Sequence, residues 1–261
     1  MPHIATASTR LFYRWDGPEL APVLVLTHAL GANHTMWDPN IAALSRDLRV
    51  LRYDSRGHGL SDVEPGPYTV ELLARDVVEL LDAVRVARAS YCGLSLGGMT
   101  GMWLGANAAD RIDRLVLANT AAHLANPGPM NERIAAVRAD GMQAVAETMI
   151  ERWFTPTFRS AEPAAADRVR KMLLATPPAG YIAACQAVRA MDMRPLLGRI
   201  RVPTLVIAGT EDPATPIDHG RNLRDQIAGS RWVELAAAHV SNIEAAAQFD
   251  AAVLKFLREP Y

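Results

Sequence analysis

Gly93-Leu94-Ser95-Leu96-Gly97-Gly98 is the segment of this chain that is most informative about its fold. An apolar, strand-like run (Ala89 to Leu94) leads into it, and a helical run (Met99 to Ala108) follows it. A serine between glycines at a strand-to-helix turn is typical of a nucleophile elbow, because the turn is strained and a Cβ at the flanking positions would clash. A glycine-rich turn with an incidental serine is the alternative. The strand–turn–helix context favours the elbow and makes Ser95 the candidate nucleophile.

The same alternation of strand and helix runs through much of the chain. Most of the strand-like runs are almost continuously apolar, as expected for parallel strands that are covered by helices on both faces. Between them lie helical patterns such as Val70 to Val84, whose leucines and Val77 form one stripe. This order predicts an α/β fold with a doubly wound, mostly parallel sheet. The other expected strands are Pro22–Thr27, Arg49–Tyr53, Leu115–Asn119, Pro203–Ala208 and Arg231–Leu235.

The alternation stops between about Ala122 and Arg194, where no convincing strand is found. Prolines and glycines divide this region into helical stretches. We therefore expect a helical cap, residues 122–194, inserted between two halves of an α/β-hydrolase core, residues 1–121 and 195–261. The expected cap helices are Asn131–Asp140, Gln143–Trp153, Ala165–Ala175 and Tyr181–Ala190.

A serine nucleophile needs a base, and the base needs an acid that orients it. In folds with such an elbow, the acid and then the base follow the serine along the chain, each in a loop after a strand. Asp212 and His239 occupy those two positions. Both are therefore expected at carboxyl ends of strands, where open α/β sheets bind ligands. Glu211 and Asp218 are rival acids, and six other histidines compete with His239, but none of them follows the last strand.

Two backbone N–H groups are expected to form an oxyanion hole. Leu96 directly follows the nucleophile, and Leu30 lies in the loop Thr27-His28-Ala29-Leu30-Gly31 after the first apolar strand. An ordinary strand-to-helix connection is the alternative for that loop. The later loop 54–61 (DSRGHGLS) is interpreted as a structural brace, because its Asp54 and Arg56 can pair and its glycines permit special φ values.

Composition excludes several classes of function. The chain has 261 residues, half of them apolar, and a net charge of -1 without a run of Lys or Arg, so neither a nucleic acid nor a membrane is expected as a partner. No apolar stretch is long enough for a membrane span and no signal peptide is recognised, and the two isolated cysteines fit a reducing compartment, so a cytoplasmic protein is expected. No metal or cofactor is expected, because histidine pairs with metal-ligand spacing, a Walker A motif and GxGxxG are all missing.

With these residues placed, the chain resembles the α/β-hydrolase family and, within it, the 3-oxoadipate enol-lactonases of the protocatechuate branch of the β-ketoadipate pathway of aromatic catabolism. The resemblance spans almost the whole chain. Its more particular stretches are residues 36–39 (MWDP), 133–142 (RIAAVRADGM), 151–156 (ERWFTP) and 239–244 (HVSNIE). A departure is Thr27-His28-Ala29, where enol-lactonases often have a small polar pair.

The resemblance implies hydrolysis of 3-oxoadipate enol-lactone to 3-oxoadipate through an acyl-enzyme. The small-molecule substrate would then be anionic, so a cation should face the pocket, and Arg133, Arg138 and Arg152 of the cap are candidates beside the aromatic Trp153. For each arginine, a solvated position on a helix is the alternative. A general carboxylesterase or lactonase, a C–C bond hydrolase and a ligand receptor of the same fold are the alternative functions. The oligomeric state stays open.

Overall fold

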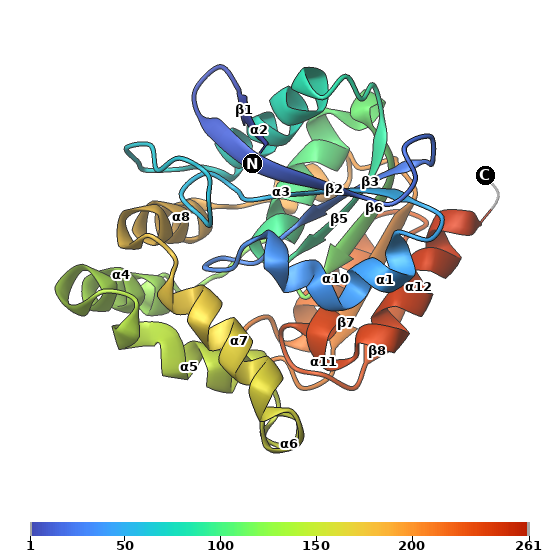
Figure 1. The fold of residues 1–261 in the computed structure, drawn as a ribbon. Coiled ribbons are helices and arrows are strands. Elements are labelled where there is room, and N and C mark those ends of the chain that lie inside the picture. The colour runs from blue at the N-terminus through green and yellow to red at the C-terminus, as the bar shows by residue number, and fades with distance from the viewer. Residues whose placement is uncertain (1, 260–261) are drawn as a thin grey trace.

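The computed structural model describes residues 2–259, so residues 1, 260 and 261 of the expected core segments lie outside the described residues. Eight strands form one sheet in the order β1-β2-β4-β3-β5-β6-β7-β8 (Figure 1). Strands β3 to β8 pair in parallel, and β1 and β2 add an antiparallel edge. The predicted mostly parallel, doubly wound sheet is confirmed.

All six expected strands are present, with ends that shift by up to three residues. They are β3 (Val23–Thr27), β4 (Arg49–Tyr53), β5 (Ala89–Leu94), β6 (Ile112–Ala118), β7 (Thr204–Gly209) and β8 (Arg231–Leu235). The sequence did not lead us to expect β1 (His3–Ala5) and β2 (Arg10–Asp16). β2 carries charges between its apolar residues because it pairs only with β1 and β4 near the sheet edge and is partly exposed.

Helices cover the sheet on both faces. The short α1 (Asp38–Leu44) packs against α11 (Ser241–Glu244) and α12 (Ala246–Arg258), so the start and the end of the chain share one helical layer. α2 (Val70–Ala83) packs against α3 (Leu96–Asn107), which also contacts α9 (Arg194–Leu197). α10 (Ile217–Gln226) packs against β7. Two 3₁₀ helices, η1 (His34–Trp37) and η2 (Ala109–Arg111), complete the core.

The expected helical cap lies between β6 and β7 and projects to one side of the sheet (Figure 1). Its helices are α4 (Gly128–Asp140), α5 (Gln143–Trp153), α6 (Pro156–Ala161), α7 (Pro163–Leu174) and α8 (Pro178–Ala190). α6 was not expected, because from the sequence we expected Pro156 to be a break between helices and not the start of one. Proline is favourable at the first position of a helix, and Thr155 caps this one by accepting a hydrogen bond from the Phe158 N–H (3.1 Å). The cap limits 122 and 194 stay a prediction.

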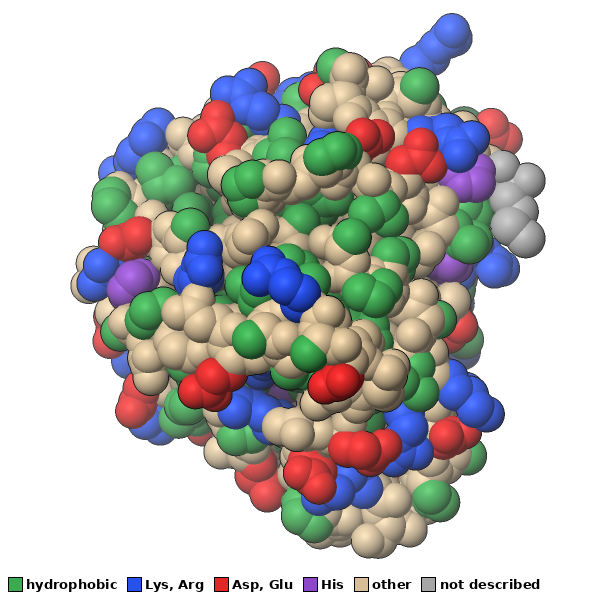
Figure 2. Space-filling view, turned by 90° about the vertical axis from the view of Figure 1, so that its left-hand side faces the viewer, with side chains coloured by type: hydrophobic (Ala, Val, Ile, Leu, Met, Phe, Trp, Pro, Cys, Tyr) green, Lys and Arg blue, Asp and Glu red, His purple; other side chains and the backbone are tan. Residues whose placement is uncertain are grey.

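Apolar side chains join the cap and the core. The buried cluster continues from the central strands into α4, α5, α7 and α8. The face that carries α4 and α8 shows apolar side chains in its middle with basic side chains beside them (Figure 2). No helix in residues 2–259 has the length and apolar character needed to cross a bilayer. The cytoplasmic location stays a prediction.

Candidate active site

The turn between β5 and α3 has the geometry of a nucleophile elbow. Ser95 has φ +57° and ψ −112°, a strained conformation for a residue with a Cβ. The glycines on either side let the chain turn so sharply. A Cβ on Gly93 would lie 2.2 Å from the Gly97 carbonyl oxygen, and one on Gly97 would lie 2.4 Å from the Thr27 carbonyl oxygen. The strain at Ser95 is held by a hydrogen bond from its N–H to the Ala118 carbonyl (2.9 Å).

Asp212 and His239 come from the loops after β7 and β8 and meet at the same end of the sheet. The distance from His239 Nδ1 to Asp212 Oδ2 is 2.8 Å, and both side chains are buried. Asp212 Oδ1 also accepts from the N–H groups of Ala214 (2.8 Å) and Thr215 (2.9 Å), and Oδ2 accepts from the Thr215 hydroxyl (2.7 Å) and from Asn119 Nδ2 (3.1 Å). Every one of these contacts uses the carboxylate as an acceptor.

These contacts fix the charge of Asp212 and the tautomer of His239. Burial alone would raise the pKa of Asp212, but the charge and hydrogen bond of His239 and the donors of Thr215 lower it to about 2. The carboxylate is therefore ionised at neutral pH and can only accept, so the proton of the neutral imidazole lies on Nδ1. Nε2 of His239 is then left as the proton acceptor. Of the rival acids, Glu211 is exposed, and Asp218 is exposed and pairs with Arg221 (3.0 Å).

A cavity of about 300 Å³ lies between the core and the cap. Ser95 and His239 both line it, together with Leu30 from the loop after β3. Most of the remaining wall comes from the cap, and most of those cap side chains are apolar, among them Met149 and Trp153. Within residues 2–259, no three His, Cys, Asp or Glu side chains form a group that could hold a metal ion.

The two expected oxyanion donors stay a prediction: Leu96 directly follows Ser95, and Leu30 lines the same cavity as Ser95. Leu96 is the first residue of α3, where backbone N–H groups have no carbonyl partner in the preceding turn. In the other loop, the Gly31 N–H donates to His58 Nε2 (3.0 Å) and the Ala32 N–H donates to the Ala29 carbonyl (3.0 Å). The next two N–H groups of that loop are thus already used inside the protein. Leu30, the residue before them, lines the cavity.

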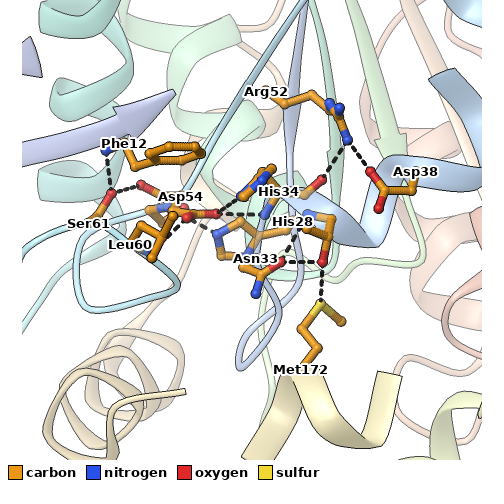
Figure 3. A network of polar contacts seen from close by, with 12 residues as sticks. Phe12, His28, Asn33, His34, Asp38, Arg52, Asp54, Leu60, Ser61 and Met172 are labelled. Carbon is orange, nitrogen blue, oxygen red and sulfur yellow. Dashed lines mark hydrogen bonds and ion pairs between the residues drawn. The ribbon is translucent and has the colours of Figure 1, made fainter. Parts of the chain in front are cut away.

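The loop 54–61 makes contacts that support its interpretation as a brace, but its partners differ from those expected. Asp54 does not pair with Arg56. Its Oδ1 accepts from the N–H (2.7 Å) and Nδ1 (2.8 Å) of His34, and its Oδ2 accepts from the Leu60 N–H (2.8 Å), as Figure 3 shows. Arg56 pairs with Asp76 of α2, which is buried as well. The expected pairing was wrong because each group has a better-placed partner elsewhere in the chain.

Two buried histidines join this brace to the oxyanion loop. His28 Nε2 accepts from the Ser55 N–H (3.0 Å), and His58 Nε2 accepts from the Gly31 N–H, so each loop contributes one histidine to the other. Burial lowers the pKa of His28 and lowers that of His58 to about 3, so both imidazoles are neutral. Sequence reasoning placed both in loops near the site but missed this role, because nothing in the sequence names their backbone partners.

The cap candidates fall into two groups. Trp153 is buried, with its ring centroid 6.2 Å from that of His239, and Arg133 and Arg152 line the cavity with it. Arg152 Nη2 donates to the Pro213 carbonyl (2.9 Å), while its Nε is buried without a partner. Arg138 is exposed on α4 and is not part of the cavity lining.

The two arginines that face the cavity are close enough to affect each other. Burial and the nearby charge of Arg133 lower the pKa of Arg152, and among the described residues neither guanidinium forms an ion pair with a carboxylate. His219 of α10 also lines the cavity. The sequence predicted only that His219 lies on a helix, because a single histidine on a helix does not indicate which part of the protein its side chain contacts.

The comparison with known proteins agrees with this geometry. The sequence matches the family described as alpha/beta hydrolase fold over residues 22–246, and the chain belongs to this α/β-hydrolase family. It is similar to 3-oxoadipate enol-lactonase 2 of Acinetobacter baylyi (37% identity, covering 93% of this chain and 91% of the relative) and to enol-lactonase 1 of the same organism (39%, 90% and 88%). The crystal structure of the enol-lactonase from Burkholderia xenovorans LB400 has a TM-score of 0.97 to this chain at 46% identity, covering 99% of this chain and 100% of that one. The expected resemblance to enol-lactonases is confirmed.

Proposed function

We propose that this protein hydrolyses 3-oxoadipate enol-lactone to 3-oxoadipate. One observation carries the proposal: the cavity that contains Ser95 and His239 also contains Arg133 and Arg152, two guanidinium groups without a carboxylate partner among the described residues. Both arginines are partly buried, and a partly desolvated cation without an anion is unfavourable, so the cavity suits a ligand that brings its own negative charge. The enol-lactone has the ester bond that the serine needs and a carboxylate for the arginines. The similarity of this protein to the 3-oxoadipate enol-lactonases named above supports the same substrate.

The side chains around the cavity can carry the reaction through an acyl-enzyme. His239 Nε2 takes the proton from Ser95 Oγ, which attacks the lactone carbonyl, and the N–H groups of Leu30 and Leu96 stabilise the oxyanion. The ring opens as His239 returns the proton to the enol oxygen, and the enol becomes a ketone. Water then attacks the acyl carbon while His239 takes a proton from it, and the bond to Ser95 Oγ breaks as His239 returns that proton to the serine and 3-oxoadipate leaves. Asp212 holds the imidazole in the required tautomer and stabilises its charged form.

The cap supplies selectivity in this proposal. A carboxylate that enters an apolar cavity loses its hydration, and charge-assisted hydrogen bonds from the Arg133 and Arg152 guanidinium groups replace it. Trp153 lines the side of the cavity next to His239 and gives the substrate an apolar wall there. The cavity is therefore expected to select a small anionic lactone as its substrate.

A side-by-side assay tests the proposal. The purified protein is given 3-oxoadipate enol-lactone and, separately, the neutral ester p-nitrophenyl acetate, and the two values of kcat/KM are compared. We expect the lactone to be strongly preferred and Ser95→Ala to reduce kcat on it by at least about 10³-fold. A wild-type protein that prefers the neutral ester would instead be a general carboxylesterase. A Ser95→Ala variant with a tenth of wild-type turnover would rule out the proposed nucleophile.

A further inference from the structure

Each backbone neighbour of His239 donates a hydrogen bond to a residue of another element, one in the core and one in the cap. The N–H of Ala238, the residue before it, donates to Glu244 Oε2 (2.9 Å). The N–H of Val240, the residue after it, donates to the Trp153 carbonyl at the end of α5 (3.2 Å). The position of the imidazole therefore depends on two hydrogen bonds that flank it.

The carboxylate of Glu244 connects the first of these bonds to the cap as well. Its Oε1 accepts from the Thr155 N–H (3.2 Å) and from the Thr155 hydroxyl, while Oε2 holds Ala238. Thr155 is the residue that caps α6, and it lies two positions after Trp153. One ionic acceptor thus joins a cap segment to the loop that carries His239, although the two partners are 89 residues apart. Such charge-assisted bonds are stronger than neutral ones.

The same cap segment also contacts the loop of the acid. We call residues 152–155 the α5 end. Within it, Arg152 donates to the carbonyl of Pro213, directly after Asp212. On the core side, Asn119 Nδ2 donates both to Asp212 Oδ2 (3.1 Å) and to the Ala238 carbonyl (3.1 Å), so the acid and base loops are joined to each other too. The α5 end therefore contacts both loops, and it also carries Trp153 of the cavity wall.

We propose that Glu244 is a positioning residue that couples the docking of the α5 end to the placement of His239. Its carboxylate has donors on both sides, and removing it frees the Ala238 N–H and Thr155 together. The imidazole then loses one of its two flanking supports, and the α5 end keeps its bonds to Val240 and Pro213 but loses the contact through Thr155. This inference rests on the role of His239 as base in the proposed function.

Three substitutions at and near this carboxylate test the inference with p-nitrophenyl acetate and the enol-lactone as probes. Small displacements of a catalytic group cost up to about 100-fold in rate, so we expect Glu244→Ala to lower kcat by about 10- to 100-fold on both substrates. Glu244→Gln keeps one carbonyl acceptor but turns its NH₂ group toward a donor. Its kcat should therefore lie between that of the wild type and that of Glu244→Ala. Glu151→Gln on α5 is the matched control, because this exposed glutamate is outside the contacts described above, and its kcat should equal that of wild type.

Thr155→Val tests the contact of Glu244 with the cap separately from its contact with the loop that carries His239. It removes the hydroxyl contact to Glu244 but leaves the Ala238 bond intact. We expect kcat/KM to fall about tenfold on the lactone, which needs the cavity wall of the cap, and to change less than twofold on p-nitrophenyl acetate. Because this hydroxyl also caps α6, the thermal midpoint of each variant is measured alongside.

The results that overturn the inference are distinct from those that overturn the proposed function. A Glu244→Ala protein with wild-type kcat, whatever its thermal midpoint, would make the carboxylate a structural contact only. If that variant does not fold, Glu244→Gln decides, and wild-type kcat in a folded Gln variant overturns the coupling. In contrast, a His239→Ala variant that retains turnover on p-nitrophenyl acetate would contradict the triad itself.

Discussion

Asp212 is an acceptor in each of its contacts, and this makes it sensitive to a change of one atom. Asp212→Asn would place an NH₂ group against donors from Thr215 or His239 and leave the imidazole in the wrong tautomer. We expect the protein to fold and kcat to fall by about 10²- to 10⁴-fold. Glu211→Gln and Asp218→Asn, both on exposed side chains, serve as controls and should change kcat less than about threefold. Steady-state kinetics of the three variants check this, and a crippled Glu211→Gln would assign the acid to the neighbouring residue.

The two arginines of the cavity, Arg133 and Arg152, allow a second test by substitution. Removing the guanidinium that pairs with the substrate leaves a desolvated carboxylate, which should lower kcat/KM on the enol-lactone by about 30- to 1,000-fold. We expect this loss for Arg152→Ala or Arg133→Ala, with little change on p-nitrophenyl acetate. Arg138→Ala is the matched control on the exposed side of α4 and should leave both values unchanged. Equal loss on both substrates would mean that the arginines support the fold instead of the anion.

At the scale of elements, the elbow depends on close approach of backbone to backbone. A Cβ on Gly93 would lie 2.2 Å from a carbonyl oxygen of the first turn of α3, so β5 and α3 could not keep their spacing. We expect Gly93→Ala to lower the free energy of unfolding by about 2 kcal/mol or more. Gly198, at the end of α9, has open space around its Cβ position and an ordinary φ of −66°, so Gly198→Ala should not lower it. Urea denaturation of both variants measures the difference, and equal values would contradict the packing described for the elbow.

The elements themselves were predictable where burial controls their sequence. The inner strands β3 to β7 were found because residues buried on both faces must be apolar, whereas β8 is a partly exposed edge strand that was found only as a short β-rich run. The proposed triad was predicted because the acid and then the base follow the serine along the chain in this fold. β2 was missed because Arg10, Arg14 and Asp16 interrupt its apolar residues at the partly exposed edge. The brace and the Glu244 contacts were missed for another reason. They join residues far apart in the chain, and a single sequence does not show which loops meet.

On the scale of the whole molecule, the buried neutral histidines make stability depend on pH. An unfolded histidine binds a proton below about pH 6.5, whereas folded His58 binds one only near pH 3, and the pKa of His28 is lowered in the same direction. Unfolding therefore takes up protons between these limits, and the stabilisation present above pH 6.5 is lost as the pH falls. We expect the free energy of unfolding to decrease from pH 7 to pH 5, with a slope approaching about 1.4 kcal/mol per pH unit for each of the two histidine protons. Asp250, whose pKa burial raises to about 6, binds a proton in the folded state in this range and offsets part of that slope.

Urea denaturation at several pH values measures this slope. His58→Gln can still accept the hydrogen bond of the Gly31 N–H but does not titrate, so it should flatten the pH dependence by up to one proton. Staying above pH 5 keeps Asp212, whose folded pKa is about 2, out of the measurement. A His58→Gln variant with the wild-type slope would show that His58 is not the group responsible.

The order of strands in the sheet also has a consequence for how the chain is made. Nascent domains form from the N-terminus during synthesis, so the ribosome delivers β1 to β6 first, then the five cap helices, and only afterwards β7 and β8. Until β7 arrives, β6 is an open edge whose middle and end are buried in the finished protein, which is the kind of strand that recruits other chains. Asp212 and His239, the proposed acid and base, both follow β7 in the chain and are therefore synthesised after it. Synthesis that stops within the cap should therefore release a fragment that is inert as a catalyst and prone to aggregate.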